Sequence, residues 1–277
     1  HGEMKVGLNE MGFLDHFENL RWHLVRSLLA VGIFTILAFV FIRWIFAHIV
    51  FAPAQLEFPT FRYMCQISQW TGIKDLCITE LPFKIQSRNM TGQFMMSVTA
   101  SFVIGLIVAF PYIVWELWRF IKPGFGERGI KLSKGTIFFV TMLFFLGIFF
   151  GYYLLSPMTV WFLSTYSISS TIANEFDITS YVSTIASLVI GCGLLFEFPV
   201  VIFFLSKIGI VTPQLMRKYR KHAVVVILIL AAVITPTADP FTLSLISLPL
   251  YLLFEISVLT SSAVMKKNLQ ESESLDT

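Results

Sequence analysis

The sequence predicts an all-α integral membrane protein with six transmembrane helices in a cupped bundle. Hydrophobic residue types make up 56% of the 277 residues, and charged types make up only 13%, about half the share found in ordinary soluble domains. The mean hydropathy is +0.77, and 29 residues are phenylalanine. A soluble globule of this composition would expose very large apolar patches, which argues against a soluble enzyme, a disordered protein and a nucleic-acid-binding protein.

Six apolar runs are candidate transmembrane helices, each of which needs about 20 mostly apolar residues. The expected helices lie near residues 25–45, 94–115, 137–155, 181–206, 223–234 and 243–259. The last two are short for a full bilayer, so we expect a locally thinned membrane or helix ends shielded by protein. Together the six runs predict a single membrane domain over residues 4–262.

The placement of lysine and arginine predicts that both termini lie in the cytoplasm. With a cytoplasmic N-terminus, 15 of the 20 lysine and arginine residues fall in cytoplasmic segments, and 5 fall on the opposite side. Cytoplasmic loops of membrane proteins carry an excess of these residues. The opposite orientation would invert a three-to-one bias, so the sequence favours the N-in, C-in topology.

The segments outside the helices differ in kind. Phe13, Phe17, Leu20 and Leu24 are spaced like one face of an amphipathic helix, which we expect at the cytoplasmic membrane surface. Residues 47–92 are expected to form a long periplasmic loop. The acidic residues of 263–277 are typical of a disordered cytoplasmic tail.

Two of the three cysteines, Cys65 and Cys77, share the long periplasmic loop. If that side of the membrane is oxidising, a disulfide between them would pin the loop. Two free thiols are the alternative, because spacing alone does not establish the geometry of a disulfide.

The sequence contains none of the common motifs of catalytic chemistry. There is no zinc-protease motif, no nucleophile elbow, no P-loop and no dinucleotide fingerprint. The five histidines are not paired with cysteine, aspartate or glutamate at a convincing metal-ligand spacing. The sequence therefore predicts no enzyme, no metal site and no cofactor.

Glu197 is the carboxylate placed deepest in a predicted transmembrane helix. A charge at such a depth costs several kcal/mol unless it is paired, hydrogen-bonded or protonated. Three interpretations stay open: a structural hydrogen bond to a neighbouring helix, a docking point for a partner helix, and a proton-relay group. Pro199 removes a backbone hydrogen bond just after it and should kink the helix.

Two further carboxylates lie at the predicted cytoplasmic ends of helices. Glu116 stands between Trp115 and Trp118 at a membrane boundary, where a solvated interfacial charge is the simplest interpretation. Glu127 follows a Pro-Gly turn in Lys122-Pro-Gly-Phe-Gly-Glu-Arg128. Taken alone, Glu127 indicates only a charged residue in a cytoplasmic loop and no function.

Six short motifs follow one another along the chain: His16-Phe-Glu-Asn-Leu-Arg21, Phe120-Ile-Lys-Pro-Gly-Phe-Gly-Glu127-Arg128, Phe196-Glu-Phe-Pro199, Ile208-Gly-Ile-Val-Thr-Pro213, Ile234-Thr-Pro-Thr-Ala-Asp239-Pro and Pro249-Leu-Tyr-Leu-Leu-Phe-Glu255. In this order and with this number of helices, they resemble the TatC family, the multispanning core of the twin-arginine protein translocase. The match covers roughly Phe13 to Ser262 and is weakest over residues 54–90.

The resemblance implies a six-helix, cupped, multi-pass protein of the bacterial inner membrane. TatC-like proteins bind the paired arginines of signal peptides at their cytoplasmic surface. They recruit TatA-type and TatB-type single-span partners in homo- or hetero-oligomers, and they pass folded proteins across the lipid bilayer with the proton gradient as the driving force. They are not enzymes, and the resemblance implies neither a cofactor nor a nucleic-acid partner.

The resemblance also assigns residues to signal-peptide binding. Glu127 matches the glutamate of the family's loop after the second helix, and Phe120 and Pro123 match its surroundings. A carboxylate can meet an arginine through two parallel hydrogen bonds, which makes it a suitable acceptor for a twin-arginine signal.

The N-terminal motif departs from the family pattern. Asn19 stands where the family usually has a glutamate, between Glu18 and the matching Arg21. Glu116 stands where many members have glutamine and could restore the lost negative charge. Our hypothesis is that Glu116 and Glu127 form the carboxylate pair that binds the signal, with Asn19 assisting and Glu18 as an alternative acceptor.

The resemblance assigns a second group to partner-helix binding and transport. Glu197 and Pro199 match a buried pair that faces the hollow of the cup in the family. Thr235 and Asp239 belong to the short connection between the last two helices. Leu243 stands where the family often has a polar glutamine of the partner-binding region, so a modified partner interface is expected.

Two other functions remain alternatives at this point. The chain could be a small proton-coupled secondary transporter using Glu197, although it shows neither an internal repeat nor a second intramembrane charge at a matching place. It could also be a structural or assembly protein of the membrane. Against this alternative, the basic cytoplasmic loops carry the carboxylate of Glu127 beside Arg128 and are not simply lysine-rich.

Overall fold

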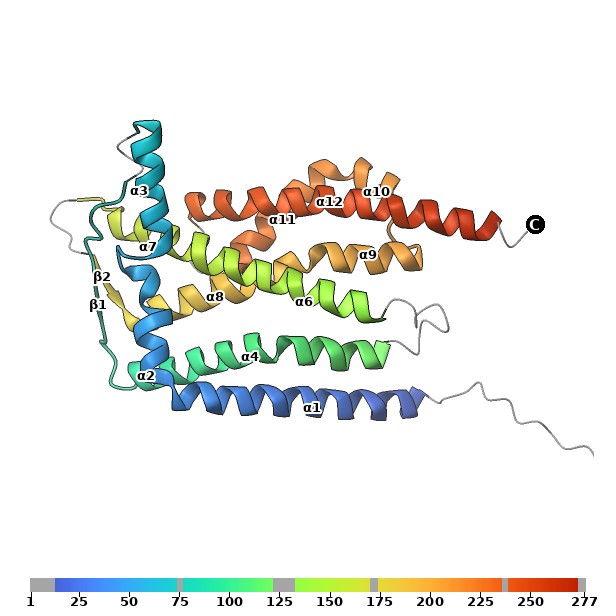
Figure 1. Ribbon diagram of the computed structural model, residues 1–277, viewed down its shortest axis with the longest axis horizontal. Helices are drawn as coiled ribbons and strands as arrows, with labels where there is room; N and C mark the ends of the chain where they lie inside the picture. The colour runs from blue at the N-terminus through green and yellow to red at the C-terminus, as the bar shows by residue number, and fades with distance from the viewer. Residues whose placement is uncertain (1–12, 74–76, 122–132, 170–173, 236–238, 274–277) are drawn as a thin grey trace, which may run out of the picture. The chain divides into compact units, whose positions relative to one another are not determined.

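Figure 1 shows a computed structural model of the chain, which describes residues 13–73, 77–121, 133–169, 174–235 and 239–273. The described residues are almost entirely helical, which confirms the predicted all-α class. They pack as two compact units, His1–Val40 with Ser101–Thr141 and Phe41–Ala100 with Met142–Thr277. Two helices, Gly92–Ile121 and Ser133–Phe149, have one end in each unit. The single membrane domain expected over residues 4–262 stays a prediction.

The first unit is built from α1 (Phe13–Val40), the second part of α4 (Gly92–Ile121) and the start of α6 (Ser133–Phe149). The amphipathic segment that begins at Phe13 is the first part of α1 and not a separate surface helix, because no glycine or proline interrupts the helix before Gly32. Helices α1 and α4 approach closely at Gly105, where an added Cβ would lie 2.7 Å from the backbone nitrogen of Thr35.

The second unit begins at Phe41 with the end of the first predicted helix and continues into residues 47–92, the expected long loop, which contains regular structure. It holds α2 (Ile42–Ile45), the π-helical η1 (Phe46–Val50), the 3-10 turn η2 (Ala52–Ala54) and α3 (Pro59–Thr71). Proline starts α3, and Gly72, with a φ of 75°, ends it. A disulfide joins Cys65 in α3 to Cys77, so the bonded alternative is confirmed.

The only strands among the described residues are two short ones that fasten this segment to a later part of the chain. Strand β1 (Lys84–Gln86) pairs in parallel with β2 (Glu175–Asp177), with Ile85 opposite Phe176. A small hydrophobic cluster lies beside the disulfide-bonded segment and consists of Phe58, Phe61, Ile78 and Met158.

The third apolar run continues beyond its predicted end. Helix α6 passes into the π-helical η5 (Phe150–Leu155) and then α7 (Ser156–Thr165). Gly147 lets this element pack directly on the backbone of the fourth run, because a Cβ at Gly147 would lie 2.5 Å from the carbonyl oxygen of Cys192. Such close contacts through small residues are typical of helix packing in membranes.

The fourth run is broken where its sequence predicts a kink. Helix α8 (Ile178–Phe196) ends immediately before Glu197, and α9 (Phe198–Ile208) has Pro199 in its first turn. Since proline cannot donate the backbone hydrogen bond that would continue α8, the interruption follows directly from the sequence.

The chain ends with α10 (Pro213–Lys218), α11 (Arg220–Ile234) and α12 (Pro240–Glu273). In the second unit α12 lies along α9 and α11 (Figure 1). The prediction of a disordered tail from residue 263 is wrong up to Glu273, because α12 continues through this segment without a glycine or proline to end it.

Five of these helical segments are long and apolar enough to cross a membrane, judged by length and composition: Leu20–Val40, Gly92–Ile121, Gly135–Thr165, Ile178–Lys207 and Pro240–Ala263. The remaining candidate, α11, has 15 residues. Many large apolar side chains of these helices are exposed in the isolated chain, as lipid contact requires. The chain is thus a multi-pass, all-α membrane protein.

Candidate functional site

The first candidate site is a carboxylate enclosed in the first unit. Glu116 lies in the last turns of α4, and its side chain is only 1% exposed. His23 of α1 places its Nδ1 2.5 Å from Oε2 of Glu116, and the Tyr112 hydroxyl donates to Oε1 over 3.0 Å. Nη1 of Arg119 lies 3.6 Å from Oε1. Both oxygens of Glu116 therefore have polar partners.

The helical repeat explains part of this arrangement. Tyr112, Glu116 and Arg119 are four and three residues apart, so they share one face of α4. Arg119 also lies 5.0 Å from the centre of the Trp115 ring, which holds the guanidinium beside the carboxylate. The ring of Phe120 stands 6.3 Å from that of His23.

His23 is the member of the cluster that the sequence analysis missed. It lies 93 residues from Glu116 along the chain, and no motif links the two positions. The interpretation of Glu116 as a solvated interfacial charge is wrong, since α1 covers it and His23 pairs with it. The described side chains of the cluster hold one another in place, and among them no nucleophile is paired with a base.

The other residues assigned to signal-peptide binding are only partly described. Arg21 is exposed on α1. Glu18 and Asn19 lie in the first turns of α1. Glu127 and Pro123 fall between α4 and α6, outside the described residues.

The second candidate site is Glu197, at the junction of α8 and α9 in the second unit. Both carboxylate oxygens are enclosed, and neither has a hydrogen-bond partner of ordinary geometry among the described residues. Glu197 also makes no side-chain capping bond to α9. The backbone of Phe144 in α6 interacts with this carboxylate, so the structural contact with a neighbouring helix stays open as an interpretation beside the two functional ones.

Thr235 and Asp239 have local roles around the connection that precedes α12. The Thr235 hydroxyl donates to the carbonyl of Ala231 over 3.0 Å, at the end of α11. Asp239 accepts from the backbone N–H of Thr242 over 2.7 Å and so caps α12. The Thr242 and Thr159 hydroxyls lie 3.1 Å apart in the interior of the same unit.

No group of three or more histidine, cysteine, aspartate or glutamate side chains that could hold a metal ion occurs within the described ranges. The two candidate sites are carboxylates: Glu116 is paired with side chains of two helices, and Glu197 makes no side-chain hydrogen bond among the described residues.

Comparison with protein families identifies similar proteins. The family model described as "Sec-independent protein translocase protein (TatC)" matches residues 15–249. A TatC of Blattabacterium from Periplaneta americana is 39% identical over 266 residues, covering 95% of this chain and 100% of that protein. TatCy of Bacillus subtilis is 31% identical over 274 residues, covering 98% of this chain and 96% of that protein.

Two solved structures described as the twin arginine translocase receptor TatC share the fold. The first has a TM-score of 0.68 and 25% identity, and covers 90% of this chain and 99% of that chain. The second, determined in DDM, has a TM-score of 0.70 and 27% identity, with 89% and 99% covered. These likenesses confirm the resemblance drawn from the six motifs, and they do not support the alternative of a proton-coupled secondary transporter.

Proposed function

Because this chain belongs to the TatC family of Sec-independent protein translocases, we propose that it is the subunit that recognises twin-arginine signal peptides at the cytoplasmic face of the bacterial inner membrane. The observation that carries this proposal is the shared fold with the two twin-arginine translocase receptors over most of both chains. The placement of lysine and arginine supports the proposed topology, and the enclosed carboxylates support the proposed binding residues.

The proposed topology has six crossings, with both termini in the cytoplasm. Helix α11 provides the sixth crossing, although its 15 residues rise only about 22 Å against a hydrocarbon core of about 30 Å. A sixth crossing returns the C-terminus to the side of the N-terminus and keeps 15 of the 20 lysine and arginine residues in the cytoplasm. The short helix requires local thinning of the bilayer.

The proposed signal-binding centre combines Glu127 with Glu116, assisted by Asn19. Glu116 already accepts hydrogen bonds from His23 and Tyr112, so a signal arginine must take the place of His23 to reach it. A guanidinium is a stronger partner for a carboxylate than an imidazole because it is always charged and donates through a planar fork. Glu18, Arg21, Phe120 and Pro123 complete the surroundings of this centre.

The proposed transport step uses the second unit. TatA-type and TatB-type single-span partners supply the polar group that the oxygens of Glu197 lack, and the proton gradient drives the export of folded cargo. Pro199 supports this role because it interrupts the helix at Glu197 and leaves the carboxylate at a helix junction. Thr235 and Asp239 shape the adjoining connection to α12.

The test is binding of a twin-arginine signal peptide to the purified full-length chain in lipid nanodiscs. A Lys-Lys peptide and an arginine-to-citrulline peptide serve as controls. Each charge-assisted hydrogen bond is worth about 1.5–3 kcal/mol, so we expect Glu127→Gln to weaken binding by about ten-fold to a hundred-fold. Glu116→Gln should weaken it as well, and Glu80→Gln, an exposed carboxylate between α3 and β1, should leave it unchanged.

Equal binding of all three peptides would overturn the receptor proposal. Loss of binding in Glu127→Gln with unchanged binding in Glu116→Gln would remove only Glu116 from the signal-binding centre. Glu116 would then be a structural member of the α1–α4 contact.

A further inference from the structure

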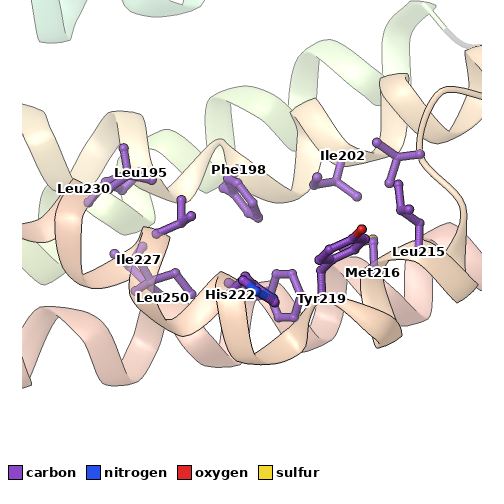
Figure 2. A pocket seen from close by; sticks show the side chains of 14 residues that line it. Leu195, Phe198, Ile202, Leu215, Met216, Tyr219, His222, Ile227, Leu230 and Leu250 are labelled. Carbon is purple, nitrogen blue, oxygen red and sulfur yellow. The ribbon is translucent and has the colours of Figure 1, made fainter.

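A cavity of about 290 Å3 lies in the second unit between α9, α10, α11 and α12 (Figure 2). Carbon atoms form almost all of its wall, and Tyr219 and His222 are the polar residues that line it. Apolar lining residues from all four helices include Phe198, Ile202, Leu215, Met216, Ile227 and Leu250. This apolar cavity is therefore not a water-filled polar site.

The cavity is elongated along α11. Its lining extends there from His222 to Leu230, which corresponds to about 12 Å of helix. A long apolar space of this kind suits an extended hydrocarbon chain, whose methylene groups gain from leaving water and need no hydrogen-bond partner.

Three cations lie next in sequence to residues that line the cavity at α10 and the start of α11. Arg217 and Lys218 form the last turn of α10, and Lys221 follows in the first turn of α11. The Lys218 ammonium lies 5.8 Å from the centre of the Tyr219 ring, and Tyr219 lines the cavity, so the charge and the apolar wall adjoin.

These cations are available to a ligand. Arg220 is engaged with Glu255 over 2.8 Å, and Tyr251 donates to the same carboxylate. None of the ion pairs found among the described residues involves Arg217, Lys218 or Lys221, and all three side chains are exposed.

We propose that this cavity binds an anionic phospholipid. One acyl chain enters the apolar space between α9 and α11, and the phosphate of the headgroup is held by Arg217, Lys218 and Lys221. Clusters of lysine and arginine at the membrane boundary attract anionic lipids, and basic pockets between transmembrane helices bind their headgroups. This site is separate from the signal-binding centre, and its existence does not depend on the proposed function.

The acyl-chain part is tested by filling the cavity. Ala223 lines the cavity, and Val225 on the same helix is 55% exposed and lies outside the lining. The full-length chain and its variants are purified in mild detergent, and the retained phospholipid is counted by native mass spectrometry. We expect Ala223→Phe to reduce retained lipid by at least about ten-fold, because several methylene contacts are lost, and Val225→Phe to retain it.

The headgroup part is tested by lipid choice. In nanodiscs of mixed phosphatidylglycerol and phosphatidylcholine, the wild-type chain should retain the anionic lipid preferentially. Each basic residue near the surface contributes about 1 kcal/mol, so Arg217→Gln with Lys218→Gln should reduce this preference by about thirty-fold. The matched control is Arg62→Gln with Lys84→Gln, which removes two cations from α3 and β1.

Several outcomes would overturn the lipid site. Equal lipid retention in Ala223→Phe and Val225→Phe would show that the cavity does not hold the chain, and an unchanged preference after the Arg217 and Lys218 changes would remove the headgroup contact. Copurification of a protein segment in the cavity would replace lipid with another occupant. If Ala223→Phe does not elute as a folded chain, Ala223→Leu carries the same test with a smaller filling group.

Discussion

Glu116 in the first unit and Glu197 in the second are carboxylates placed within apolar helices, and their surroundings are opposite. Both oxygens of Glu116 have polar partners from two helices, with His23 at 2.5 Å and Tyr112 at 3.0 Å. Both oxygens of Glu197 are enclosed, and neither has such a partner among the described residues. Each carboxylate lies near a helix end, so position along the helix does not explain the difference.

The difference separates a carboxylate whose side-chain partners lie within the chain, so that a ligand must displace His23 to reach it, from one with no side-chain partner among the described residues. Burial of a polar group is costly unless it is hydrogen-bonded, and most buried polar groups in native proteins are. Glu116 obeys this rule within the chain and thereby joins α1 to α4. Glu197 has no side-chain partner among the described residues, and the transport step that we propose would supply a proton or a group from a partner subunit.

The largest effect that this comparison predicts is on export. Glu197→Ala should abolish export of a folded reporter that carries a twin-arginine signal, while binding of the signal peptide stays within about two-fold of wild type, since the recognition carboxylates are retained. The reporter is assayed in cell fractions, and peptide binding is measured on the purified chain. Leu194→Ala, an exposed position on α8, is the matched control.

Normal export in Glu197→Ala would contradict the proposal that Glu197 takes part in transport. The unpartnered carboxylate would then be a defect that the fold tolerates and not a site that partners use.

The next largest effect is on stability at Glu116. Glu116→Ala should lower the free energy of unfolding by about 2–3 kcal/mol, because His23 and Tyr112 lose their hydrogen bonds to a charged group. The apparent melting temperature in detergent reports this loss. A double-mutant cycle with His23→Ala isolates the pair, and additive effects of the two changes would contradict a direct interaction.

The sequence predicts most of the fold and only part of the candidate sites, for physical reasons. Apolar runs identify five spanning helices and the break at Pro199, because hydropathy and the missing proline donor act locally. The His23–Glu116 pair depends on how α1 and α4 pack, and nothing within either segment encodes it. In the C-terminal tail the sequence predicted too little structure. Its acidic composition suggested disorder, whereas α12 continues to Glu273.

The disulfide and the helix α3 illustrate the same limit. Two cysteines in one segment left bonded and free thiols equally open, because a disulfide needs a specific backbone geometry that spacing does not give. The pair forms because Cys65 is carried by α3 and Cys77 follows the turn that Gly72 makes at the end of this helix.

A smaller effect should follow from Glu197→Gln. Because the carboxylate makes no side-chain hydrogen bond among the described residues, and an amide oxygen can still accept from the Phe144 backbone, this change should alter the free energy of unfolding by less than about 1 kcal/mol, and stabilisation is the favoured direction. Glu116→Gln, measured by the same melting assay, should be clearly destabilising because an amide cannot replace the charge that His23 and Arg119 face. Equal losses in both variants would erase the distinction between the two carboxylates.

The smallest effect concerns Asp177, which lies at the opposite end of α8 from Glu197 and outside the spanning segments. Hydrogen bonds from the Thr179 hydroxyl, from the Thr179 backbone N–H at 2.8 Å and from the Arg88 backbone N–H at 3.0 Å hold the pKa of Asp177 below its ordinary value of 3.8. The stabilisation is fully present above the ordinary value and is lost as the pH falls through the lowered pKa. Asp177→Asn should therefore lower the melting temperature slightly at pH 7, and the difference from wild type should close below pH 3.8. A difference in melting temperature that persists in acid would contradict this prediction. It would mean that the Asp177 cap stabilises the start of α8 through the shape of its hydrogen bonds and not through its charge.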